Sequence, residues 1–236
     1  MGGCRFYVTF IDDCSLKVWV YFMKENSEVF THFQNFKAMV EKQTGSFVQC
    51  LRSDGGGEYF SNEFSIFLKK HGIQRQFSCR YTYQQNGVAE RKNRHIAEVA
   101  RALMSEKNMP PCYWVEAAST TVYTMNRTPT AAVHDMMLEE TFTGKKPDVS
   151  HFKVFGCIAY VHVPDELRTK LDPKAERCVF IGYSVEPKGY KCYNLVTRQV
   201  RVSRDVVFDE MATWYADVKD DIGADVNKQV AENSDA

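Results

Sequence analysis

Residues 5–23 read RFYVTFIDDCSLKVWVYFM. Two runs rich in Val, Phe, Tyr and Trp, Arg5–Ile11 and Leu16–Met23, lie on either side of the polar segment 12–15. β-Branched and aromatic residues favour extended strands, and a short polar segment between two such runs favours a turn. This stretch therefore predicts a β-hairpin.

Helical and strand patterns alternate after the hairpin. Apolar residues recur at spacings of three and four between Val29 and Val40, which predicts a helix that Asn26 or Ser27 caps and Gly45 ends. Further strands are expected at 47–51 and 73–77, and further helices at 62–71, 88–107 and 112–125. Strands and helices in this order predict an α/β domain.

The character of the chain changes after about residue 127. Residues 127–150 contain Thr-Pro, Gly and Lys-Lys-Pro, and predict a linker with one short helix. Short strand-like runs follow at 154–163, 178–183, 190–195 and 199–208, which predicts a small SH3-like β module. We therefore expect four segments: a core over 1–126, a linker over 127–150, a β module over 151–209 and an acidic flexible tail over 210–236.

The net charge of zero hides an uneven distribution. Residues 166–204 hold nine Lys and Arg against four Asp and Glu (9 − 4 = +5), whereas residues 209–236 hold two Lys against eight Asp and Glu (2 − 8 = −6). Such a split accompanies nucleic-acid binding in some proteins. Charge alone leaves open the alternative of two solvated surfaces of opposite sign.

The cysteines and the hydropathy exclude several classes of protein. None of the eight cysteines forms a C-x-x-C pair, and the six histidines have no metal-ligand spacing beside them, which predicts a reduced, intracellular protein. No run of 18 apolar residues predicts a membrane span, and the N-terminus has no signal-peptide pattern. We expect no membrane partner.

Two carboxylates, Asp54 and Glu90, stand out by position. Asp54 follows a predicted strand and precedes three consecutive glycines, where backbone can approach a ligand closely. Glu90 lies in the first turn of the helix predicted over 88–107. At about 100° per residue, that helix turns Glu90, Arg94 and Arg101 outward together and its apolar residues away from them.

One acid among bases on an exposed helix face suits a carboxylate that binds Mg²⁺ or Mn²⁺ while its neighbours hold phosphates. The alternative is a solvated amphipathic helix in which Glu90 and Arg94 form an ordinary i,i+4 pair. The helix alone leaves both interpretations open.

Three blocks of this sequence closely resemble the integrase of copia-type LTR retrotransposons. They read RFYVTFIDDCSLKVWVYFMK from Arg5, LRSDGGGEYF from Leu51 and QQNGVAERKNR from Gln84. Shorter blocks, VFGC from Val154, FIGY from Phe180 and VSRDVVF from Val202, extend the resemblance over about residues 3–210. Between Asp54 and Glu90 lie 35 residues (90 − 54 − 1), which is the spacing of the family's second and third catalytic acids.

The resemblance implies a ribonuclease H-like α/β integrase core followed by an SH3-like β module of a Pol polyprotein. It implies a DDE motif in which three acids hold two Mg²⁺ or Mn²⁺ ions for 3′-end processing and strand transfer. Asp54 and Glu90 match the second and third acids, as catalytic residues and metal ligands. The bases assigned to DNA binding are Arg91, Lys92, Arg94 and Arg101. The implied partners are DNA, both the element ends and the target, and a homo-oligomer, with action in the nucleus.

The family's first acid lies on a strand upstream of the hairpin, before the position of Met1. Asp12 and Asp13 lie in a turn that the family also has, so we do not expect either to replace it. That upstream strand is central in the family's sheet, between the hairpin and the strand that ends at Asp54. We therefore expect a core without its first, central strand, unpaired backbone at both flanking strands and marginal stability or aggregation.

The leading hypothesis is an N-terminally truncated integrase fragment that binds nucleic acid and is inactive alone. The alternative is a domesticated, non-catalytic DNA-binding or interaction module, whose DNA binding would survive loss of Asp54. A nuclease of the ribonuclease H type is a third hypothesis, and the incomplete acid set argues against it.

Overall fold

The computed structural model describes residues 3–53, 56–59, 61–77 and 87–214 of the 236-residue chain. The chain divides into two compact units. Unit 1 comprises residues 1–99 and 121–149, and unit 2 comprises residues 100–120 and 150–236. In the part of the chain that the structure describes, no helix is long and apolar enough to span a bilayer.

Unit 1 begins with the predicted hairpin. Strands β1 (Phe6–Ile11) and β2 (Val18–Met23) pair in antiparallel register, with Phe6 opposite Met23 and Ile11 opposite Val18. The connecting turn is held by Asp12, whose carboxylate accepts hydrogen bonds from the backbone N–H of Ser15 at 2.8 Å and from its hydroxyl at 2.7 Å. The strand-forming residues and the polar turn thus produce the predicted hairpin.

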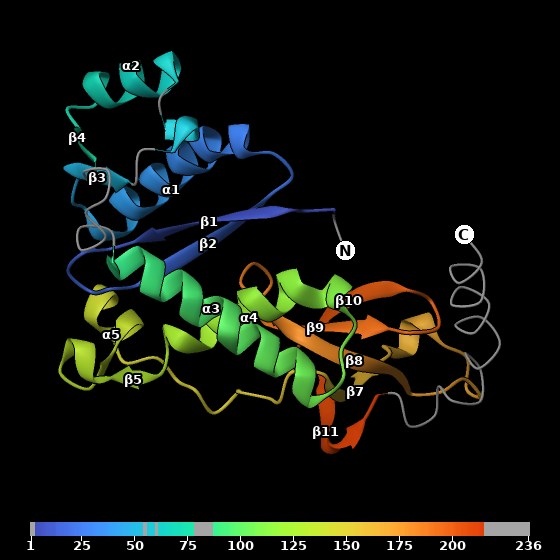
Figure 1. Ribbon diagram of the computed structural model, residues 1–236. Helices are drawn as coiled ribbons and strands as arrows, with labels where there is room; N and C mark the ends of the chain where they lie inside the picture. The colour runs from blue at the N-terminus through green and yellow to red at the C-terminus, as the bar shows by residue number, and fades with distance from the viewer. Residues whose placement is uncertain (1–2, 54–55, 60, 78–86, 215–236) are drawn as a thin grey trace, which may run out of the picture. The chain divides into compact units, whose positions relative to one another are not determined.

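Helix α1 (Val29–Thr44) packs its aromatic residues against this hairpin, beside which it lies in Figure 1. The ring of Phe10 on β1 stacks on Phe36 with centroids 4.6 Å apart and meets Phe33 edge-on at 5.8 Å. Gly45 ends the helix in the left-handed conformation, as predicted.

The predicted cap of this helix, Asn26 or Ser27, is wrong. Residues Asn26–Glu28 form a 3-10 turn, η1, and the residue that caps it is Glu25. The Glu28 carboxylate accepts the backbone N–H groups of Lys24 at 2.8 Å and Glu25 at 2.9 Å. The capping box thus satisfies backbone donors at the start of the turn that precedes α1.

The second strand pair of unit 1 is parallel. Strands β3 (Cys50–Ser53) and β4 (Gln74–Phe77) are connected through η2 (Gly57–Tyr59) and helix α2 (Asn62–Lys70). The strand predicted from residue 47 begins three residues later, and Phe47 is 81% exposed. The apolar run was therefore a poor guide to where this strand starts.

Two edges of strands remain open in unit 1. Among the described residues, β1 pairs with β2 alone and β3 pairs with β4 alone. A cavity of about 710 Å³ lies between them, lined by Phe10 and Ile11 of β1 and by Cys50, Leu51 and Arg52 of β3. In the part of the chain that the structure describes, no strand joins the hairpin to the strand that precedes Asp54.

The rest of unit 1 and part of unit 2 come from residues 87–143. The elements in this segment are α3 (Gly87–Glu106), η3 (Pro111–Tyr113), α4 (Trp114–Met125), β5 (Pro129–Thr130), η4 (Ala131–Val133), β6 (Met136–Met137) and α5 (Leu138–Thr143). Helix α5 is the short helix expected within the predicted linker. The proposed domain boundaries stay a prediction, since the two compact units follow a different division.

The sheet of unit 2 has five antiparallel strands in the order β10-β9-β8-β7-β11. Their bounds are Cys157–His162 (β7), Ala175–Ser184 (β8), Gly189–Asn194 (β9), Gln199–Ser203 (β10) and Val206–Thr213 (β11), with η5 (Asp165–Leu167) after β7. The single strand predicted at 199–208 is in fact two strands. They are separated by Arg204 and Asp205 and lie at opposite edges of the sheet.

A glycine permits close packing inside unit 2. The backbone of Gly182 on β8 has φ of +137°, and a Cβ placed there would come within 2.6 Å of the Thr120 hydroxyl oxygen on α4. The β8–β9 register is irregular between Phe180 and Gly182. The absence of a side chain thus allows this strand to approach residue 120 of its own unit.

Candidate functional site

The first turns of helix α3 carry the candidate acid Glu90. The side chain of Asn93 fixes this part of the helix to β1, because its Oδ1 accepts the Thr9 hydroxyl at 2.8 Å. The Tyr7 hydroxyl donates to the backbone oxygen of Asn93 at 3.4 Å, and Ile96 is fully buried one turn later. The hairpin therefore determines the position of Glu90 through a contact one helical turn away.

The face of α3 that carries Glu90 is exposed. Glu90, Arg94 and Arg101 are exposed, as the helical spacing predicted. On the other side Ile96 and Ala100 are buried. A carboxylate and two guanidinium groups thus share one solvent-facing face of a single helix, where the bases can contact phosphates.

The four bases assigned to DNA binding do not share one environment. Arg91, Arg94 and Arg101 are exposed, but Lys92 is half-buried. Burial lowers the pKa of the Lys92 ammonium group. At about 100° per residue, Lys92 lies about 200° around the helix from Glu90, on its far side. The sequence therefore contained the signal that separates Lys92 from the other three bases.

The second candidate acid, Asp54, lies outside the described residues, as does the adjacent Gly55. Strand β3 ends at Ser53, which is 6% exposed. Arg52, one residue earlier, contacts the carboxylate of Asp13 at 3.8 Å. The structure thus describes one of the two proposed metal ligands, Glu90.

Metal-binding side chains do not cluster in the described part of the chain. Within residues 3–53, 56–59, 61–77 and 87–214, no group of three His, Cys, Asp or Glu side chains is arranged to hold a metal ion. A Mg²⁺ site built from carboxylates needs several of them at one place. The described residues alone therefore do not form such a site.

Several bases of the segment 166–204 already have acidic partners within unit 2. Lys191 pairs with Glu116 at 3.2 Å, and Arg201 pairs with Glu176 at 3.3 Å. Arg168 pairs with Asp165, three residues earlier. These ion pairs neutralise part of the positive charge of the segment, so fewer of its bases are available to contact a partner.

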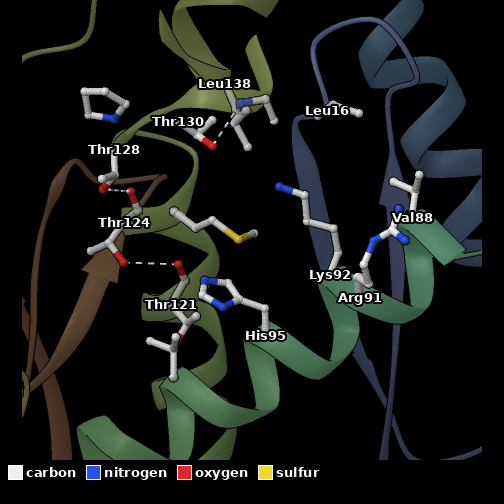
Figure 2. Close-up of a pocket in the computed structure, with 14 residues that line it drawn as sticks. Leu16, Val88, Arg91, Lys92, His95, Thr121, Thr124, Thr128, Thr130 and Leu138 are labelled. Atoms are coloured by element: carbon white, nitrogen blue, oxygen red, sulfur yellow. Dashed lines mark hydrogen bonds between the residues drawn. The ribbon is translucent and has the colours of Figure 1, made fainter. Parts of the chain in front are cut away.

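Sequence reasoning missed a pocket on the far side of α3. It lies within unit 1 and has a volume of about 570 Å³. Figure 2 shows Lys92 and His95 reaching from α3 toward a wall that includes Thr121 and Thr130. Lys92, which does not lie on the exposed face of α3 with Glu90, thus lines this pocket.

Comparison with protein families gives two matches on this chain. The integrase core domain matches residues 2–82, and the retroviral polymerase SH3-like domain matches residues 157–222. Asp54 lies inside the first match and Glu90 lies beyond its end. Together with the observed elements, these matches confirm the predicted order of an α/β core and a small β module.

Relatives from plants match most of the chain. It is 47% identical over 210 residues to the retrovirus-related Pol polyprotein from transposon TNT 1-94 of Nicotiana tabacum, a match that covers 89% of this chain and 16% of the relative. It is 36% identical over 206 residues to the corresponding protein from transposon RE2 of Arabidopsis thaliana, covering 87% of this chain and 14% of the relative. The chain thus spans less than one fifth of the length of either protein.

A solved structure shares the fold. The cryo-EM structure of the simian T-cell lymphotropic virus intasome in complex with PP2A regulatory subunit B56 gamma contains a chain with a TM-score of 0.50 and 15% identity. The similarity covers 84% of this chain and 72% of that one. At this level of identity the likeness concerns the fold alone.

Proposed function

Because this chain belongs to the integrase region of copia-type retrotransposon Pol polyproteins, we propose that it is a nucleic-acid-binding part of the DNA integration machinery. The observation that carries the proposal is the exposed face of α3, where Glu90, Arg94 and Arg101 lie together. The resemblance implies metal-dependent 3′-end processing and strand transfer for the intact family. We propose these reactions, in the nucleus, for the longer protein to which this chain corresponds in part.

The proposed DNA contacts are electrostatic. Arg91, Arg94 and Arg101 are exposed and free to place guanidinium groups against phosphate oxygens, which fixes a duplex without reading its sequence. The proposed DNA partners are the ends of the element and the target. We also propose a second copy of the chain as a partner, because two strand edges of unit 1 are open to further pairing.

The proposed metal ligands are Asp54 and Glu90, for Mg²⁺ or Mn²⁺. When bound, such ions would activate an attacking hydroxyl group and offset charge on the phosphate. The described residues do not supply a set of three ligands around Glu90. Two carboxylates bind these ions weakly, so we propose that the chain has no strand-transfer activity by itself.

A strand-transfer assay tests the catalytic part of this proposal. The full chain is incubated with an oligonucleotide duplex that carries an element end, a target plasmid and Mn²⁺. We expect no joined product. Product formation that both Asp54→Ala and Glu90→Ala abolish would contradict the proposal, because it would demonstrate a working metal site.

DNA binding is tested separately by fluorescence anisotropy at several salt concentrations. The double variant Arg94→Gln/Arg101→Gln should bind a duplex more weakly, with a salt slope shallower by about two phosphate contacts. Lys69→Gln, an exposed base on α2, is the matched control and should change neither quantity. Equal losses in both variants would refute a specific role for the α3 face.

A second candidate function is a domesticated, non-catalytic module that binds DNA or another protein. It is favoured by the exposed arginines of α3, which can contact phosphates without a metal ion. It predicts that neither Asp54→Ala nor added Mg²⁺ or Mn²⁺ changes the DNA affinity or its dependence on salt. Metal-stimulated binding that requires Asp54 would favour the integrase proposal instead.

A further inference from the structure

The pocket on the far side of α3 has one wall made by that helix. Its volume of about 570 Å³ is in the range typical of small-molecule sites. The residues of this wall recur at helical spacing and are Val88, Arg91, Lys92, His95 and Val99. The facing wall carries the threonines Thr121, Thr124, Thr128 and Thr130. The pocket therefore has a cationic wall and a hydroxyl-bearing wall (Figure 2).

The charge of the pocket is positive and unbalanced. Arg91 and Lys92 carry one positive charge each, and none of the lining residues is Asp or Glu. The acid next to the lining residue Leu138 is Glu139, which is already held by Lys17 at 2.9 Å and by Arg127 at 3.8 Å. The described residues thus leave the pocket with a field that attracts anions.

The burial of Lys92 makes an anionic ligand favourable. Its ammonium group is half-buried, and burial lowers its pKa. A cation removed from water is disfavoured unless a partner offsets its charge. An anion in the pocket would supply that partner and would raise the pKa again.

The remaining lining residues would contact an uncharged part of the ligand. Val99, Met125, Pro129 and Leu138 add apolar surface between the two walls. The Thr130 hydroxyl oxygen accepts the backbone N–H of Ala132 at 3.5 Å, so its hydrogen can be donated to a ligand. A ligand with a phosphate group, polar edges and a flat apolar ring fits these three kinds of surface.

We propose that this pocket binds a nucleotide, with the phosphate against Arg91 and Lys92 and the sugar and base against the apolar and threonine surface. The nucleotide is either free or the terminal unit of a DNA strand. This inference rests on the proposed function in one respect, because Arg91 and Lys92 are also among the four bases assigned to DNA binding. The pocket lies on the opposite face of α3 from Glu90.

Calorimetric titration of the full chain tests the pocket, with adenosine monophosphate, inorganic phosphate and adenosine as probes. Adenosine monophosphate should bind best, and Lys92→Gln should weaken it about tenfold or more through loss of a charged hydrogen bond. Lys92→Arg should restore most of the affinity. Ala132→Trp, which fills an exposed edge of the pocket without changing its charge, should also block binding.

Arg94→Gln is the matched control, since it removes a base from the other face of the same helix. It should leave the affinity for adenosine monophosphate unchanged and weaken only duplex binding. If adenosine monophosphate does not bind, or if Ala132→Trp does not affect its binding, the proposal that this pocket binds a nucleotide is wrong. Duplex binding that persists in that case would leave the proposed function intact.

A second titration, with duplexes that carry or lack a 5′-phosphate, separates the two sources of the nucleotide. Competition between the phosphorylated duplex and adenosine monophosphate assigns the pocket to a strand end. Independent binding of both assigns it to a free nucleotide. Nucleotide binding without any duplex binding would support the pocket and refute the proposed function.

Discussion

The side chain of Asn126 hydrogen-bonds to both backbone groups of Val18. Its amide nitrogen donates to the Val18 carbonyl oxygen at 2.7 Å, and its Oδ1 accepts the Val18 N–H at 3.0 Å. Both residues are buried, with exposed fractions of 5% and 1%. Asn126 therefore gives the first residue of β2 the pair of hydrogen bonds that a neighbouring strand would give.

Replacement of Asn126 should destabilise unit 1. Asn126→Ala leaves a buried N–H and a buried carbonyl of Val18 without partners, at a cost of about 2–4 kcal/mol. Urea unfolding followed by circular dichroism measures the change. Thr128→Ala, which removes an exposed hydrogen bond to the Thr124 carbonyl, is the control and should cost less than about 1 kcal/mol. Similar losses in the two variants would show that the Asn126 contacts contribute little.

The ion pair of Lys17 and Glu139 should respond asymmetrically to substitution. Burial lowers the pKa of Lys17 even though Glu139 lies 2.9 Å away, so the buried cation is a net cost that its partner reduces. Glu139→Gln should destabilise unit 1 by about 3 kcal/mol, because it leaves that cation buried without a charged partner. Lys17→Met should be near neutral, since Arg127 still contacts Glu139 at 3.8 Å. Thermal melting of the two variants tests this difference. Equal losses of stability in Glu139→Gln and Lys17→Met would contradict the prediction.

The capping box before α1 should make stability depend on pH. Hydrogen bonds from the backbone of Glu25 and of Lys24 hold the pKa of Glu28 below its ordinary value of 4.5. A carboxyl group with a lowered folded-state pKa contributes stability that is present above the unfolded pKa and is lost as pH falls through the folded one. Melting temperatures from pH 7 to pH 3 should therefore fall less steeply in Glu28→Gln. Ser61→Ala, which removes the non-titrating cap of α2, is the control and should lower the melting temperature without changing the slope.

The open edges of β1 and β3 should promote self-association. Light scattering coupled to size exclusion should show oligomers or aggregates of the full chain, and thermal melting should be poorly reversible. Phe47→Lys, at an 81% exposed residue lining the cavity between the two strands, should reduce association. Leu171→Lys, at a 97% exposed residue of unit 2, is the matched control. A monomer with a cooperative, reversible transition would contradict this prediction.

The cysteines should separate into reactive and inert groups. Burial raises the pKa of Cys157 and of Cys192 to about 12 and that of Cys178 to about 11, so these thiols stay protonated. Among the described residues, Cys14, Cys50 and Cys112 are exposed. Mass spectrometry after iodoacetamide treatment at pH 8 should find the three exposed cysteines alkylated and the three buried cysteines unmodified. All should react in denaturant, and rapid native labelling of Cys157 would show that the sheet of unit 2 opens.

Local patterns predicted the elements of this fold better than their edges or their long-range contacts. The hairpin followed from its residue types, but the start of β3 did not, because Phe47 is apolar and yet exposed. The bond between Asn126 and Val18 joins residues 108 positions apart, and no local pattern encodes it. A helical wheel places Lys92 and Arg94 on different faces of α3, so the sequence could predict that separation. It could not predict the pocket that Lys92 lines, because the facing threonines come from later segments of the chain.

The two residues between β10 and β11 limit the shape of the sheet in unit 2. Ser203 ends one edge strand and Val206 begins the strand at the opposite edge. Three peptide steps reach at most about 11 Å, so the two edges must come that close at this corner. A five-stranded sheet achieves this by curling, so that its two edge strands approach each other at this corner. The short connection therefore fixes a strongly curved sheet, although β10 and β11 do not pair with each other.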